Sequence, residues 1–126
     1  EAGLAPREAA LIRDLVSLLG SEVKLGVTIV QVPIFVGLGA ALAVETDREL
    51  SVGEAEELLR KAPGVEVAAD TDCRASTRSV AGRSSVLVGR LRADPGAPRG
   101  LLLWLVADPL RLAASHAIEL ALRRLA

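Results

Sequence analysis

The sequence predicts an α+β domain with a largely antiparallel or mixed sheet and helices on one face. Two observations favour this class. Helical and strand-like patterns occur in the order helix, strand, strand, helix, strand, strand, strand, helix. The later strand patterns are joined by turn-rich segments, and few helices are placed to cross over between parallel strands. With 126 residues, 51% of them apolar, the chain is long enough for one domain with its own core.

The first element is an amphipathic helix predicted over residues 6–19. Pro6 suits the first turn of a helix, and Gly20 can end it. Leucines recur at helical spacing at positions 11, 15, 18 and 19.

Twenty residues without a charge follow, from Leu25 to Val44. A stretch of this length could span a bilayer as a helix. Strands are favoured instead because the stretch is rich in β-branched residues and is interrupted by Pro33 and several glycines. In a helix interior, proline costs about 3 kcal/mol and glycine about 1 kcal/mol. We predict one strand over residues 22–36 and a second over 40–46, both covered on two faces.

A capping box begins the next helix. Ser51 can accept a hydrogen bond from the backbone, and Glu54 can reach back to the cap, so a helix is expected to run to about Lys61. Residues 65–67 alternate as a short strand, and the polar residues 69–84 are predicted to be a surface loop that crosses to the next strand.

The last third of the sequence predicts two strands and a helix. Residues 85–92 form a strand, a Pro- and Gly-rich hairpin connection follows, and residues 101–107 form a central, fully buried strand. Asp108 and Pro109 are typical of the N-cap and first turn of a helix, which we expect over about residues 109–125.

The composition disfavours several classes of function. Fifteen basic and sixteen acidic residues give a net charge of −1, and Phe35 and Trp104 are the only aromatic residues, so we expect no nucleic-acid partner. The single Cys73 excludes an internal disulfide and a cysteine-rich zinc site, and we expect no metal. The N-terminal residues lack the pattern of a signal peptide, so a cytoplasmic protein without a membrane partner is expected.

Three segments together resemble the C-terminal half of aspartate-semialdehyde dehydrogenases. They are VPIFVG with the following ALAVET at residues 32–37 and 41–46, VGRLR at residues 88–92, and GLLLWLVAD at residues 100–108. The resemblance implies that residues 1–126 form a dimerisation and substrate domain, similar in fold to the C-terminal domain of glyceraldehyde-3-phosphate dehydrogenase. It also implies a homodimer formed through the sheet face, in an oxidoreductase family of amino-acid biosynthesis.

The family's NADP-binding Rossmann domain and its nucleophilic cysteine belong to an N-terminal part that these residues do not match. No glycine-rich nucleotide fingerprint occurs in the sequence, and Cys73 lies in a polar segment where the family has no nucleophile. We therefore expect no cofactor to be bound by this chain alone, and NADP only where a Rossmann segment is present. The last helix is expected to pack towards that segment.

The resemblance places the family's functional positions on residues that lack its chemistry. Its substrate-binding arginine falls on Gln31, and its catalytic histidine, seven residues later, falls on Leu38. Glutamine cannot make the charged bidentate clamp of a guanidinium, and leucine carries no exchangeable proton. The family's Glu-x-Lys substrate pair falls on Glu8 and Ala10, so the acid remains while the phosphate-binding lysine is absent.

The cofactor side shows the same pattern. The family's asparagine before the last helix falls on Pro109, and its next helical asparagine falls on Ala117, whereas Asp108 and Arg111 match the family. No catalytic residue is intact, which is similar to the bacterial branch with degenerate active sites. The first hypothesis is therefore a pseudoenzyme. The alternatives are part of an NADP-dependent aldehyde dehydrogenase with an altered substrate, and a non-catalytic binder of small anions around Glu8, Gln31 and Arg111.

Overall fold

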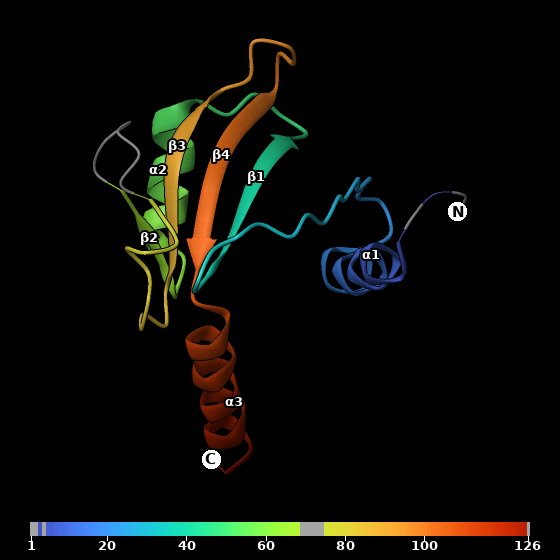
Figure 1. Ribbon diagram of the computed structural model, residues 1–126. Coiled ribbons are helices and arrows are strands. Elements are labelled where there is room, and N and C mark those ends of the chain that lie inside the picture. Colours follow the sequence, from blue (N-terminus) through green and yellow to red (C-terminus); the bar gives the residue numbers. More distant parts are fainter. Residues whose placement is uncertain (1–2, 4, 69–74, 126) are drawn as a thin grey trace. The chain divides into compact units, whose positions relative to one another are not determined.

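The computed structural model describes residues 3, 5–68 and 75–125 of the chain. The chain divides into two compact units, Glu1–Pro33 and Ile34–Ala126, and each is described by itself. The elements, labelled in Figure 1, are α1 (Pro6–Leu19), β1 (Leu38–Glu45), α2 (Val52–Lys61), β2 (Val65–Val67), β3 (Val86–Ala93), β4 (Gly100–Ala107) and α3 (Pro109–Leu125).

Helix α1 has the bounds that the sequence predicts. Pro6 occupies the first turn, and Glu8 accepts a hydrogen bond from the backbone N–H of Ala5 at 2.9 Å, which satisfies one of the free donors at the helix start. Gly20 ends the helix with a φ of 101°, and its N–H donates to the carbonyl of Val16 at 2.9 Å. Such a positive φ is costly for residues other than glycine.

The strand predicted over residues 22–36 does not form. This part of the chain leaves α1 and reaches β1 without helix or strand (Figure 1). The prediction was wrong because β propensity expresses how well a side chain fits a pleated surface beside a neighbouring strand. No strand of the described residues pairs with this segment, so its preference alone does not create a ladder.

The sheet contains four strands in the order β1-β4-β3-β2. Strand β4 pairs antiparallel with both β1 and β3, whereas β2 pairs parallel with β3. The predicted α+β class with a mixed sheet and a β3–β4 hairpin is therefore confirmed. The second predicted strand, over residues 40–46, forms as Leu38–Glu45, and all eight of its residues lie opposite residues of β4.

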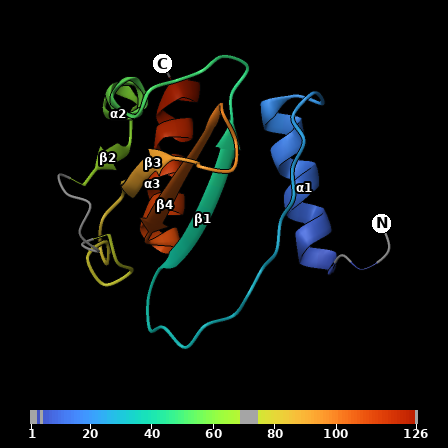
Figure 2. The ribbon, with the colours of Figure 1, turned by 90° about the horizontal axis from the view of Figure 1, so that it is seen from above.

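Helix α2 begins with the predicted capping box. The hydroxyl of Ser51 accepts from the N–H of Glu54 at 3.2 Å, and the carboxylate of Glu54 accepts from the N–H of Ser51 at 2.9 Å. The helix contacts β2 and β3 and buries Ala55. In Figure 2, α2 and the turns of residues 75–84 lie on opposite sides of the sheet.

Two predictions about burial are corrected. Central strand β4 is buried at its ends, but residues 102–105 are only half-buried, and Leu38, Leu42 and Val44 of β1 are exposed. Within the unit of residues 34–126, β1 packs mainly against β4, and no helix makes an extensive contact with it, so this edge of the sheet stays partly open. The loop predicted over residues 69–84 was expected to lie on the surface, but part of it belongs to the core. Ala75 and Val80 are buried and pack with Val106. Residues 69–74 lie outside the described part of the chain.

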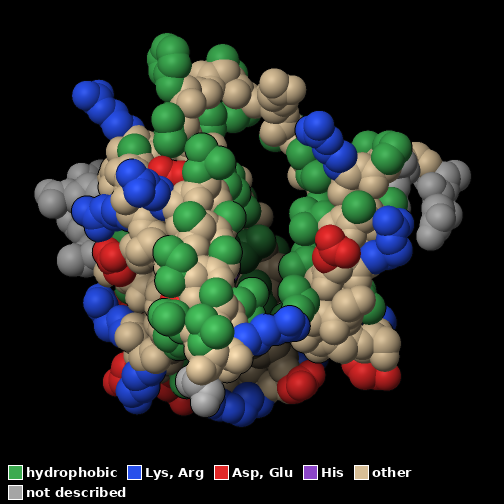
Figure 3. Space-filling view, turned by 90° about the horizontal axis from the view of Figure 1, so that it is seen from below, with side chains coloured by type: hydrophobic (Ala, Val, Ile, Leu, Met, Phe, Trp, Pro, Cys, Tyr) green, Lys and Arg blue, Asp and Glu red, His purple; other side chains and the backbone are tan. Residues whose placement is uncertain are grey.

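Helix α3 has the predicted bounds, and none of its described residues is buried. Figure 3, which views the molecule from below, shows hydrophobic side chains along its surface. The large exposed ones are Leu110, Ile118, Leu120, Leu122 and Leu125.

Candidate functional site

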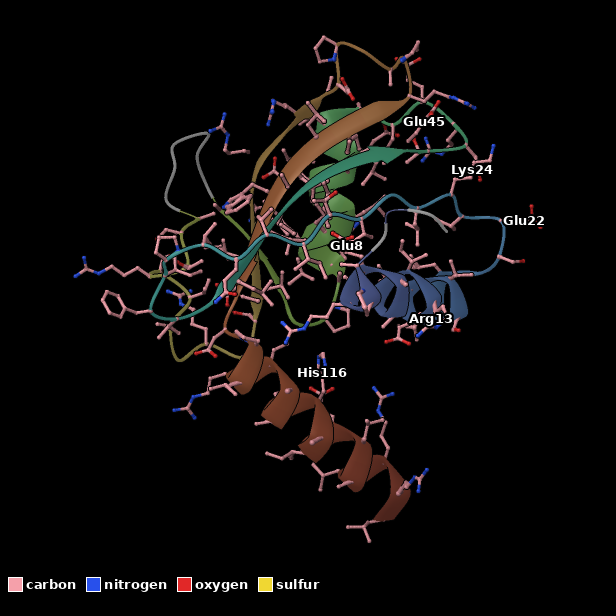
Figure 4. All side chains as sticks on the ribbon, turned by 45° about the vertical axis from the view of Figure 1, so that its right-hand side comes forward. Glu8, Arg13, Glu22, Lys24, Glu45 and His116 are labelled. Atoms are coloured by element: carbon pink, nitrogen blue, oxygen red, sulfur yellow. The ribbon has the colours of Figure 1, made fainter. Side chains whose placement is uncertain are left out.

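Glu8 is the acid at the position that the resemblance assigns to the family's substrate pair, and both of its carboxylate oxygens are occupied. One oxygen accepts from the N–H of Ile29 at 2.8 Å, and the other accepts from the N–H of Ala5 at 2.9 Å. The hydrogen bond from Ile29, followed by that from Ala5, lowers the pKa of Glu8 below its usual value. Glu8 (labelled in Figure 4) therefore ties the start of α1 to the segment that follows the helix.

Gln31 and Ala10 belong to the same unit as Glu8. Gln31 lies two residues beyond the bond to Ile29 and is exposed, and Ala10 is half-buried on α1. Neither residue carries a positive charge that could hold a carboxylate or a phosphate. This unit therefore contains one acid that is already bound to backbone donors, and neutral residues at the two positions to which the resemblance assigned cations.

Leu38 opens β1 opposite Ala107, the last residue of β4. The preceding Gly37 has a φ of 98°, and a Cβ on it would stand 2.8 Å from the Cβ of Thr77 and 3.3 Å from the carbonyl oxygen of Ala107. The structure thus places Leu38, the predicted counterpart of the family's histidine, at the end of the sheet where α3 begins, close to the turns of residues 75–84.

Asp108 is the best-connected polar residue at this end of the sheet. Only 6% of its surface is exposed, and its carboxylate accepts three backbone hydrogen bonds. Gly82 donates to one oxygen at 2.9 Å, while Leu110 and Arg111 donate to the other at 3.1 and 3.2 Å. The bond from Gly82, then that from Arg111, lowers the pKa of Asp108. The predicted N-cap of α3 is confirmed, and Gly82 is a partner that sequence reasoning missed.

The remaining predicted positions lie along α3. Pro109 takes the first turn, where a missing N–H costs nothing, and Ala117 is exposed on the helix surface. His116, labelled in Figure 4, is also exposed on this helix. The anion pocket predicted around Glu8, Gln31 and Arg111 draws on both units of the chain, because Arg111 belongs to α3 and the other two residues precede Ile34.

A hollow of about 460 Å³ lies on the face of the sheet opposite α2. The indole N–H of Trp104 donates to the carbonyl of Ala75 at 2.8 Å beside it, and Arg92 donates to the carbonyl of Arg90 at 3.0 Å. Its walls are Ala41, Leu42, Ala43, Ala75, Arg90, Arg92, Leu102, Leu103 and Trp104. The sequence pattern indicated strands here but no concavity.

The shape of this hollow depends on an irregularity in β3. The pairing of β3 with β4 shifts between Gly89 and Arg92, and Arg90 takes a φ of 55°. Such a bulge turns side chains out of simple alternation. Arg90, within this shift, and Arg92, at its end, both line the hollow.

Other candidates give no site among the described residues. Asp70 and Asp72, two carboxylates of the predicted polar loop that could suggest a cation site, and Cys73 lie outside residues 3, 5–68 and 75–125. Within those ranges, no group of three or more His, Cys, Asp or Glu side chains could hold a metal ion. No helix in the described part of the chain has the length and apolarity needed to cross a membrane.

The mixed four-stranded sheet, flanked by α2 and followed by the capped helix α3, is a small α+β domain. Residues 13–112 match the family model for the dimerisation domain of semialdehyde dehydrogenases, and the chain belongs to this family. The resemblance seen in the three sequence segments is therefore confirmed.

The relatives are aspartate-semialdehyde dehydrogenases. The protein of Aquifex aeolicus is 34% identical over 125 residues, which cover 96% of this chain and 37% of that protein. The Legionella pneumophila protein is 40% identical over 99 residues, which cover 75% of this chain and 28% of that protein. This chain thus spans little more than a third of the Aquifex aeolicus protein.

A solved structure supports the fold over nearly the whole chain. The crystal structure of aspartate-semialdehyde dehydrogenase II from Vibrio cholerae, complexed with ASA, matches with a TM-score of 0.84 and 28% sequence identity. The match covers 98% of this chain and 38% of that structure. The predicted fold of a semialdehyde dehydrogenase C-terminal domain is confirmed.

Proposed function

We propose that this chain pairs with a second copy through the face of its sheet that carries the hollow, and that it takes no part in aldehyde chemistry. The observation that carries the proposal is the open apolar surface of β1 and β4. Helix α2 packs against β2 and β3, while on the face with the hollow Ala41 and Ala43 of β1 are exposed and Leu102 and Trp104 of β4 are only half-buried. Apolar strands left open to this extent favour burial by a partner.

The face with the hollow suits close approach of a second sheet. Residues directly opposite in an antiparallel pair project to the same face, so Ala41 and Trp104 share this face, as do Ala43 and Leu102. The small alanines leave room for a partner's side chains beside the large indole. Arginine and tryptophan are also enriched in the residues that anchor interfaces, and Arg92 lies at the border of this surface.

The proposal of inactivity rests on the chemistry of three positions. Gln31 and Ala10 stand where the family places cations, and Leu38 stands where it places a proton-transferring histidine. The retained Glu8 uses both oxygens on backbone donors. NADP would bind only to a Rossmann segment, and we propose a cytoplasmic protein.

Sedimentation equilibrium at micromolar concentration tests the pairing. We expect a dimer for the unaltered chain and a monomer for Ala43→Arg, because a charged side chain without a partner would be buried in an apolar contact and weaken it by about tenfold or more. Leu58→Arg is the matched control, since Leu58 is 56% exposed on α2, away from this face. It should remain dimeric with the same circular dichroism spectrum. A monomeric unaltered chain would contradict the proposed pairing.

Assays of the full-length gene product test inactivity. We expect no reduction of NADP that depends on aspartate semialdehyde, and none with other small aldehydes. The triple variant Ala10→Lys, Gln31→Arg, Leu38→His restores the family's charges and proton carrier. We expect this variant to bind the substrate more tightly than the unaltered protein does. Turnover by the unaltered protein would refute inactivity, and turnover with a different aldehyde would support the altered-substrate enzyme instead.

A further inference from the structure

We draw no further inference here: the strongest candidate, the hollow lined by Trp104 and Arg92 on the open face of the sheet, belongs to the surface already proposed to pair with a second copy, and nothing in the structure shows a separate occupant for it.

Discussion

Gly39→Ala is expected to destabilise the folded chain by about 1–3 kcal/mol, which is the usual cost of forcing extra volume into a packed site. A Cβ on Gly39 would stand 2.4 and 2.5 Å from two carbons of the Trp104 ring, closer than real carbon contacts allow. The indole cannot move aside easily, because its N–H donates to the carbonyl of Ala75. Urea unfolding followed by far-ultraviolet circular dichroism, at one protein concentration, measures the loss.

Gly53→Ala provides the matched control for Gly39→Ala. Gly53 lies in α2 with no atom within 4 Å of an added Cβ, so alanine should stabilise the helix by about 0.5–1 kcal/mol. The double variant Gly39→Ala, Trp104→Leu should show less than the summed loss of its two single variants, because the smaller side chain removes the clash. Equal stability of Gly39→Ala and the unaltered chain would refute the close contact.

The helices of this fold are predictable from the sequence because their ends are determined locally. Pro6 and Gly20 bracket α1, Ser51 and Glu54 cap α2, and Asp108 caps α3, and each cap acts within a few residues of its helix. The prediction of a strand over residues 22–36 was wrong because strands, unlike helix ends, are not determined locally. A strand depends on its neighbour, and neighbours cannot be inferred from β propensity alone.

The candidate site was predictable only in part. The family resemblance predicted the positions of the functional residues. It could not predict that Ala5 and Ile29 donate hydrogen bonds to the Glu8 carboxylate, because these bonds depend on how the chain folds back after α1. The hollow on the sheet was missed because it needs the bulge near Arg90 and the approach of Ala75 to Trp104. These contacts join residues far apart in the sequence and leave no periodic pattern.

Asp108→Asn is expected to lower the unfolding midpoint at neutral pH and to lose this effect in acid. Asparagine can still accept the two N–H groups of the α3 cap, but its amide nitrogen would face the N–H of Gly82, so that bond is lost. The pKa of Asp108 is lowered in the folded state, so its carboxylate stabilises the fold above the unfolded pKa of about 3.9. This contribution disappears as the pH falls through the lowered folded pKa.

The difference between the unaltered chain and Asp108→Asn should therefore be full at neutral pH and shrink as the pH falls below the unfolded pKa of about 3.9 and through the lowered folded pKa. Urea midpoints measured across this range give the profile, and Glu119→Gln, on the exposed surface of α3, serves as a charge-removing control without a capping role. A difference that stayed constant with pH would mean that Asp108 stabilises the fold by packing rather than by its charge. A difference confined to acid pH would contradict the hydrogen-bonding role, because a lowered pKa can only add stability on the alkaline side.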